Sequence, residues 1–224
     1  MIQLTQDQRS YDWYKARLGM FTASQIAKLM TASKKKDEIF GDTAKTYIAL
    51  VAMERKVKER WDDMTDEERD NFIRHQYPCN KAMEWGTYHE EFARSAFEFD
   101  RGVTVTQYGS CIREEMPYVS ASPDGYIESE QAIIEIKCPQ LETFGRYVMN
   151  VVDGATLKAE KSDYYWQMML QMWITGANYG YFVWYHPLIG MEFAMIERND
   201  EDINNMLQRI EKAEELAKET YDKL

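Results

Sequence analysis

A short apolar stretch with two charged residues in it constrains this chain more than any other feature. Residues 120–139 read SASPDGYIESEQAIIEIKCP. The run AIIEI at 132–136 has the apolar, β-branched character of a buried strand, yet Glu135 and Lys137 stand two residues apart in this segment. Side chains at that spacing point to the same face of a strand. The stretch therefore predicts an acid and an amine side by side in an otherwise buried sheet.

A second acid precedes this strand in a tight turn. Asp124 lies in Pro-Asp-Gly, which alone is most often an ordinary turn, just as Glu-Ile-Lys alone is most often a solvent-facing ion pair. Two carboxylates close together in a sheet repel each other unless a cation lies between them. Asp124, Glu135 and the main-chain carbonyl of Ile136 would supply the oxygen ligands that Mg²⁺ or Mn²⁺ prefers. Lys137 would then lie beside a metal-bound water, which indicates phosphodiester hydrolysis.

Two predicted helices carry further polar groups. A helix expected at about 80–99 carries Glu90, which is a candidate for a third acid at the site. A helix expected at about 160–175 carries Gln167 and Gln171 four residues apart, and therefore on one face of an otherwise apolar helix. The residues leave two interpretations open, since these amides either reach toward the metal site or are hydrogen-bonded glutamines without a role in it.

The order of the predicted elements indicates an α/β fold, with a central mixed sheet flanked by helices. We expect a single domain over residues 1–224, and a charged surface helix or loop at 62–79. The predicted helices cover residues 5–16, 22–31, 43–61, 80–99, 140–150, 160–175 and 200–222, with Thr22 and Ser24 as cap residues. The predicted strands are VTVTQYGSCIR, PYVSAS, GYIES, AIIEIKC, YGYFVWYH and GMEFAMIER.

Charge is distributed unevenly along the chain. The net charge of −11 at first argues against a nucleic-acid partner. Residues 1–60, however, carry 12 Lys/Arg and 7 Asp/Glu, so this part of the chain can bind phosphate locally. The acids of the remainder are expected mostly to form a solvated surface, with a few at the metal site.

Composition also bears on the compartment. We expect no membrane span, because no apolar run approaches the roughly 20 residues that cross a bilayer, and the first residues lack the pattern of a signal peptide. The 3 cysteines have no Cys-x-x-Cys spacing and indicate reduced thiols in the cytoplasm.

Asp124 and Glu135-Ile136-Lys137, with Pro123 before them, have the form of the PD-(D/E)xK nuclease signature. Within that superfamily the chain resembles the phage lambda exonuclease and YqaJ-like viral recombinase family, and the resemblance covers nearly the whole chain. It implies a restriction-endonuclease-like core. It rests on blocks in the same order, which are RLGMFTAS at 17–24, EWGTYHEEFARSAFEFDRGVTVT at 84–106, SPDG at 122–125, EIKCP at 135–139 and QMWIT at 171–175.

The resemblance implies an activity and a set of site residues. Members of this family are 5′→3′ exonucleases that need Mg²⁺ and digest one strand of linear duplex DNA from a 5′-phosphorylated end. By position, the implied ligands of one or two metal ions are Asp124, Glu135, the Ile136 carbonyl, Glu90 and Glu114. Lys137 would position the attacking water, and Gln167 would complete the catalytic set. The implied 5′-phosphate and DNA-binding residues, partly on the N-terminal helices within 1–61, are Arg17, Thr22, Ser24, Ser122, Lys34 and Trp13.

The resemblance alone implies the partners. Family members form a ring-shaped homotrimer around duplex DNA and work with a phage single-strand annealing protein in homologous recombination, in the cytoplasm of a bacterial host. The segment 59–79 is longer and more acidic than the family pattern. The resemblance therefore does not define the local shape of the DNA entrance or of a subunit contact in this segment. Two alternatives stay open: an endonuclease or single-strand nuclease with the same metal site, and a non-enzymatic acidic DNA-mimic protein.

Overall fold

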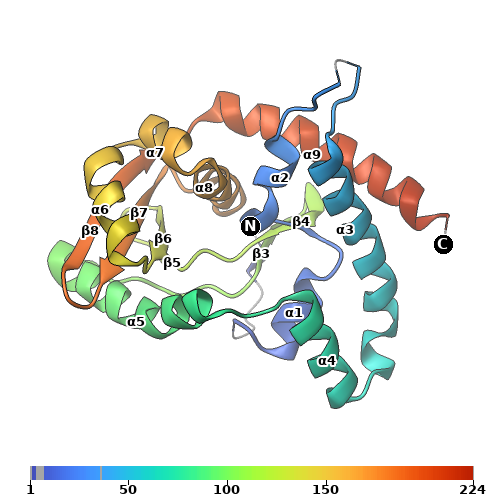
Figure 1. The fold of residues 1–224 in the computed structure, drawn as a ribbon, viewed down its shortest axis with the longest axis horizontal. Helices are drawn as coiled ribbons and strands as arrows, with labels where there is room; N and C mark the ends of the chain where they lie inside the picture. Colours follow the sequence, from blue (N-terminus) through green and yellow to red (C-terminus); the bar gives the residue numbers. More distant parts are fainter. Residues whose placement is uncertain (1, 4–7, 36, 224) are drawn as a thin grey trace.

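The helices surround two groups of strands in the computed structural model, which describes residues 2–3, 8–35 and 37–223 (Figure 1). The expected α/β fold, with mixed sheets flanked by helices, is confirmed. The helices are α1 (Tyr11–Arg17), α2 (Ala27–Met30), α3 (Asp42–Arg60), α4 (Asp66–Gln76), α5 (Lys81–Arg101), α6 (Leu141–Asn150), α7 (Gly154–Glu160), α8 (Ser162–Thr175) and α9 (Asp200–Tyr221), with the 3₁₀ turns η1 (Ala23–Gln25) and η2 (Trp61–Asp63).

Within the described residues the strands form two four-stranded sheets instead of one central sheet, and both are mixed. The first sheet has the order β1-β3-β4-β2, and the second has the order β5-β6-β7-β8. In chain order the strands are β1 (Ile2–Gln3), β2 (Phe21–Thr22), β3 (Cys111–Arg113), β4 (Met116–Ala121), β5 (Gly125–Ile127), β6 (Ala132–Lys137), β7 (Tyr179–His186) and β8 (Gly190–Glu197).

The chain passes from the first sheet to the second within the segment Ser122-Pro123-Asp124. β4 ends at Ala121 and β5 begins at Gly125. Pro123 has no N–H to donate to a ladder, so it separates the two strands at this point. The segment that the sequence singled out is therefore the junction of the two sheets.

Helix α8 lies near the middle of the molecule (Figure 1). It contacts β6 and β7 of one sheet and β3 and β4 of the other. Its side chains are buried on nearly every face, including Met168, Leu170 and Ile174. A helix that is apolar all round belongs in a core. Among its polar side chains, Gln171 is therefore buried and Gln167 half-buried where α8 packs on β6, whereas Ser162 and Asp163 at its start are exposed.

The N-terminal region differs from the expected pair of helices. Helix α1 begins at Tyr11 because the Ser10 hydroxyl accepts from the Trp13 N–H at 3.2 Å; residues 4–7 of the expected helix lie outside the described residues. The expected helix at 22–31 begins later than predicted. Thr22 ends β2, which pairs in parallel with β4, and the 3₁₀ turn η1 stands between β2 and α2. Burial of the β2 side chains against β4 outweighs the local helical pattern.

Two further segments differ from the secondary structure that the sequence predicts. The run VTVT, at 103–106, contributes only an isolated bridge from Thr106 to Tyr126. The structure contains helix α7, which the sequence pattern did not predict, although Asp153 and Thr156 cap each other reciprocally at its start. In contrast, α4 forms the expected charged surface helix within 62–79, and Thr65 begins it with a capping box.

All three cysteines are free thiols in the structure. Among the helices of the described residues, none has both the length and the apolar character needed to cross a membrane.

A buried ion pair joins α3 to α9, and breaking it is expected to destabilise the fold. Arg55 donates to both carboxylate oxygens of Glu214, at 3.2 and 2.5 Å, and to the Gly19 carbonyl at 3.0 Å. The Arg55→Met variant leaves the Glu214 carboxylate buried with only a partial partner in Lys218, which lies 3.5 Å away. We expect the free energy of unfolding to fall by about 3 kcal/mol in chemical denaturation.

The exposed pair of Lys35 with Glu38 provides the control for this measurement. Exposed pairs contribute little to stability, so the Lys35→Met variant should have nearly the same free energy of unfolding as the wild type. Equal stability of Arg55→Met and wild type would show that the pair does not hold α3 and α9 together.

Candidate active site

The main chain of β6 presents two polar groups to Asp124. The Ile136 N–H donates to Asp124 Oδ2 at 2.7 Å. Among the described strands, β5 begins at Gly125 opposite Ile134, so the following residues of β6 have no strand partner on that edge. The N–H and C=O of one strand residue point to the same side. The Ile136 carbonyl therefore also faces the side of Asp124.

The Glu135 side chain is buried, and polar side chains hold both of its oxygens. Oε1 accepts from Gln167 Nε2 at 2.6 Å and from the Lys137 ammonium. Oε2 accepts from Gln171 Nε2 at 2.7 Å. Both glutamines of α8 thus reach the site, because their spacing of four puts them on the face that packs on β6. Lys137 Nζ also lies 4.8 Å from the centre of the Tyr164 ring.

The charges at this site shift one another's protonation. Burial and the neighbouring Glu135 carboxylate raise the pKa of Asp124 well above its usual range, and Glu90 adds to the shift. The Lys137 charge and the Ile136 N–H act in the opposite direction. Burial disfavours the charged form of Lys137, but Glu135 and Asp124 outweigh it and raise the pKa of the ammonium. In the absence of a further cation, the crowding of Asp124 and Glu135 therefore favours a proton on Asp124.

Helix α5 brings Glu90 to this centre. Arg94 donates to one Glu90 oxygen at 2.8 Å, and Arg9 donates to the other at 3.4 Å. Within the described residues, no three acidic, histidine or cysteine side chains are grouped as a complete metal site. Asp124, Glu135 and a main-chain carbonyl are nevertheless oxygen donors of the kind that suits Mg²⁺, which usually keeps several waters as ligands. The donor set fits such an ion.

Glu114 does not join the other acids. It is exposed in the turn between β3 and β4. Asp124 follows the other end of β4, and a six-residue strand is about 20 Å long. The expectation that Glu114 is a metal ligand is therefore not supported by its place in the fold.

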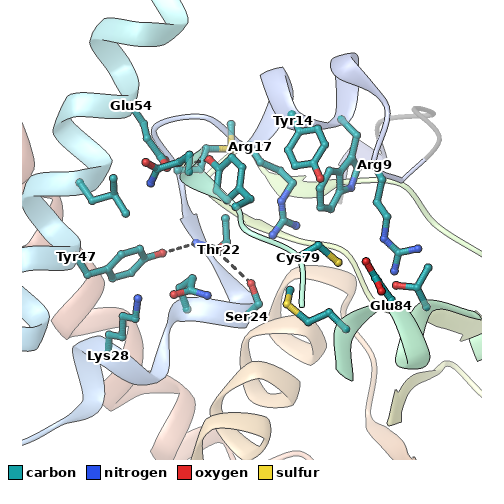
Figure 2. A pocket seen from close by; sticks show the side chains of 18 of the residues that line it. Arg9, Tyr14, Arg17, Thr22, Ser24, Lys28, Tyr47, Glu54, Cys79 and Glu84 are labelled. Carbon is teal, nitrogen blue, oxygen red and sulfur yellow. Dashed lines mark hydrogen bonds between the residues drawn. The ribbon is translucent and has the colours of Figure 1, made fainter. Parts of the chain in front are cut away.

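A cavity of about 730 Å³ gathers most of the predicted phosphate-binding residues (Figure 2). Arg17, Thr22, Ser24 and Trp13 line it. Ser122 is tied to the same wall, because its hydroxyl accepts from Arg17 at 3.0 Å and from the Trp13 indole at 3.2 Å. The Arg17 guanidinium also lies 4.2 Å from the centre of the Trp13 ring.

Lys34 is the predicted phosphate-binding residue that the structure places elsewhere. It is exposed on the loop after α2 and is not part of the cavity lining; Lys36 lies outside the described residues. Lys28, one turn after Ser24, lines the cavity instead. The spacing of four from a predicted residue on one helical stretch was a signal for it.

Other residues that line the cavity belong to no motif of the sequence. From α3, the Tyr47 hydroxyl accepts from the Thr22 N–H at 2.9 Å, and Glu54 lies buried in the wall. Tyr77, just after α4, donates its hydroxyl to Glu54 at 2.8 Å and stacks on Tyr14 with ring centres 5.4 Å apart. Tyr47, Glu54 and Tyr77 lie outside the recognised blocks, and the packing of α3 and α4 against α1 brings them here.

Several solved structures with a similar fold are described as exonucleases. An alkaline exonuclease (LHK-Exo) from Laribacter hongkongensis matches with a TM-score of 0.74 and 27% identity over 94% of both chains, and LHK-Exo in complex with dAMP gives the same values. A phage related exonuclease from Haemophilus somnus 129PT matches in fold, with a TM-score of 0.64 and 18% identity over 91% of this chain and 94% of that chain. No curated protein sequence matches.

A family model described as a YqaJ-like viral recombinase domain matches residues 12–178. The match takes in both the cavity residues of α1 and the whole Asp124–Lys137 segment, and it ends beyond α8. This chain belongs to the YqaJ-like viral recombinase family.

Proposed function

We propose that this protein is a Mg²⁺-dependent 5′→3′ exonuclease that degrades one strand of linear duplex DNA from a 5′-phosphorylated end. One observation carries the proposal: Ser122 joins the cavity to the centre. Its hydroxyl is bonded to Arg17, and Asp124 follows two residues later in the chain. Two residues span at most about 7 Å. An end held by Arg17 therefore lies next to the acids that would cleave it.

Asp124, Glu135 and the Ile136 carbonyl would hold Mg²⁺, with Mn²⁺ as the alternative ion, and Glu90 would serve a second ion. When bound, such an ion activates a water and withdraws charge from the attacked phosphate. Gln167 and Gln171 fix both oxygens of Glu135. Lys137 stays cationic beside Glu135, where it can orient a water and stabilise charge that develops on the phosphate.

The cavity would hold the terminal phosphate. Arg17 supplies a guanidinium that can donate to two phosphate oxygens, and Thr22, Ser24 and Ser122 supply hydroxyls. Lys28 adds a second positive charge to the wall. A site that holds the 5′ end beside the cleavage centre favours release of nucleotides from ends over cutting within a strand.

The wider role follows from the family. We propose that the protein acts in phage-type homologous recombination, as a homotrimeric ring around duplex DNA and together with a single-strand annealing protein, in the host cytoplasm. Similar fold and 27% identity to an alkaline exonuclease support the nuclease activity. Gel filtration with light scattering checks the assembly, and a monomeric protein with full activity would contradict the ring.

The direction of digestion tests the proposal. A blunt duplex carries a label at the 5′ end or the 3′ end of one strand, and the protein is added with Mg²⁺. We expect early release of the 5′ label as a mononucleotide, while the 3′ label stays in long fragments. Early release of the 3′ label, or internal fragments from both substrates, would contradict the proposed polarity.

A further inference from the structure

One wall residue of the cavity has the wrong charge for an anion site. Glu54 on α3 is 7% exposed and lines the same cavity as Arg17 (Figure 2). A carboxylate there repels an anionic ligand, and burial leaves that repulsion poorly screened by solvent. Glu54 belongs neither to the sequence blocks nor to the cleavage centre, so its presence needs a reason of its own.

Hydrogen bonds to both carboxylate oxygens hold Glu54 in place. Its Oε1 accepts from the Tyr77 hydroxyl at 2.8 Å, and its Oε2 accepts from the Gly19 N–H at 3.2 Å. Gly19 stands two residues after Arg17, so the second contact ties the carboxylate to the segment that carries the guanidinium. In the described residues Arg17 donates to Ser122 and forms no ion pair with Glu54. The guanidinium thus keeps donors for a ligand, while Glu54 stays nearby as a fixed negative group.

The two groups interact through their charges. Burial raises the pKa of Glu54, while the Tyr77 hydroxyl, the Gly19 N–H and the Arg17 charge lower it. Burial likewise lowers the pKa of Arg17, and Tyr47, Tyr77, Glu54 and Tyr14 oppose that shift. A phosphate bound to Arg17 would therefore also experience the Glu54 carboxylate.

We propose that Glu54 limits the affinity of this cavity for a terminal phosphate, so that the 5′ end is released as the strand advances. The inference rests on the proposed function, in which each cut leaves a new 5′-phosphate. An exonuclease that held every end tightly would stall after each step. A fixed, buried like charge weakens binding of the anionic end without removing the donors that select it.

Binding of DNA ends tests this inference. Fluorescence anisotropy in EDTA compares a short blunt duplex with 5′-phosphoryl ends and one with 5′-hydroxyl ends. In the Glu54→Gln variant we expect the ratio of the two affinities to rise about tenfold in favour of the phosphoryl end, as for a buried like charge removed from an interface. Glu84→Gln makes the same change at an exposed position of the cavity, where solvent screens the charge, and should alter the ratio less than about twofold.

Kinetics separate this role from a structural one. With Mg²⁺ and 5′-phosphoryl duplex, Glu54→Gln should lower both KM and kcat, because ends bind more tightly and leave more slowly. Damage to the cavity would instead raise KM. Thermal unfolding checks that the variant is folded, and Glu54→Met is a second neutral variant for which the same rise in the ratio is expected.

The outcomes distinguish the inference from the proposed function. An unchanged or lower ratio in both folded Glu54 variants would overturn the inference. If the wild type already binds both ends equally and Arg17→Met changes nothing, the phosphate site itself fails. If the wild type prefers the phosphoryl end and Arg17→Met abolishes that preference, the phosphate site is supported. The Glu54 variants then test the role of Glu54 independently of it.

Discussion

Replacing Asp124 by asparagine is expected to lower the rate of DNA degradation at least about 1000-fold, since loss of this proposed metal ligand would remove several kcal/mol of transition-state stabilisation. Asparagine has the same size, and its amide oxygen can still accept from the Ile136 N–H, so the turn is retained. The rate is measured as release of acid-soluble nucleotides from linear duplex with Mg²⁺.

The same substitution should stabilise the metal-free protein. The pKa of Asp124 is raised in the folded state by burial and by Glu135. Its contribution to stability is therefore fully present below the unfolded value of about 3.9 and is lost as the pH rises through the folded value. At neutral pH in EDTA, Asp124→Asn should melt at least about 2 °C above the wild type, which corresponds to about 1 kcal/mol in a chain of this size. Mg²⁺ should raise the melting temperature of the wild type more than that of the variant.

The Glu114→Gln variant is the matched control for Asp124→Asn. The sequence resemblance gives both acids to the metal site, whereas the fold places Glu114 at the far end of β4. We expect Glu114→Gln to degrade DNA at close to the wild-type rate. A loss as large as that of Asp124→Asn would contradict the position of the site, and an active Asp124→Asn variant would contradict the site altogether.

Arg17→Met should remove the preference for 5′-phosphorylated ends. The Arg17 guanidinium is partly buried between the Trp13 ring and the Ser122 hydroxyl, where water competes little for a bound phosphate. Loss of one partner from a buried charged pair weakens binding by about 2–5 kcal/mol, so the preference should fall about 30-fold or more. The ratio of kcat/KM for 5′-phosphoryl and 5′-hydroxyl duplex measures it.

Lys34→Met serves as the comparison for Arg17→Met. It removes the same charge from an exposed loop outside the cavity lining, where a phosphate contact would be screened by salt. We expect the preference to stay within about threefold of the wild type. A larger loss with Lys34→Met than with Arg17→Met would place the terminal phosphate on the loop after α2 and not in the cavity.

The grouping of side chains at the candidate cleavage centre could largely be predicted from the sequence because its geometry is local. Glu135 and Lys137 share a strand face through the period of two, and Gln167 and Gln171 share a helix face through the spacing of four. The apolar surroundings of both pairs indicated that those faces are buried. What remained open, whether the glutamines touch the acid, depended on α8 packing directly on β6.

The cavity could be predicted only in part, because its walls come from distant segments. The 17–24 block placed Arg17 and Thr22, but Tyr47, Glu54 and Tyr77 reach it through long-range packing of α3 and α4. The strand β2 was also missed. Its two residues are too few for a periodic pattern, and pairing with β4, about 100 residues later, decides their conformation.

The acidic segment around α4 is a related case. Its charge suggested only a surface element, yet its end supplies Tyr77 to the cavity, and Tyr11 bonds Asp70 at 2.6 Å to hold the helix against α1. Within this charged helix, Phe72 contacts the rings of Trp61 and Tyr77. Sequence patterns describe the exposed face well, but they do not show which neighbour the other face will meet.

The central claim is that the Asp124–Glu135–Lys137 centre hydrolyses DNA from ends with the help of a divalent metal ion. One time course tests it most directly: the purified protein is incubated with Mg²⁺ and either linear 5′-phosphorylated duplex or the same DNA as a covalently closed circle, with and without EDTA. We predict steady release of 5′-mononucleotides from the linear duplex alone, and none in EDTA. Equal release in EDTA, or cutting of the closed circle at a similar rate, would contradict the claim.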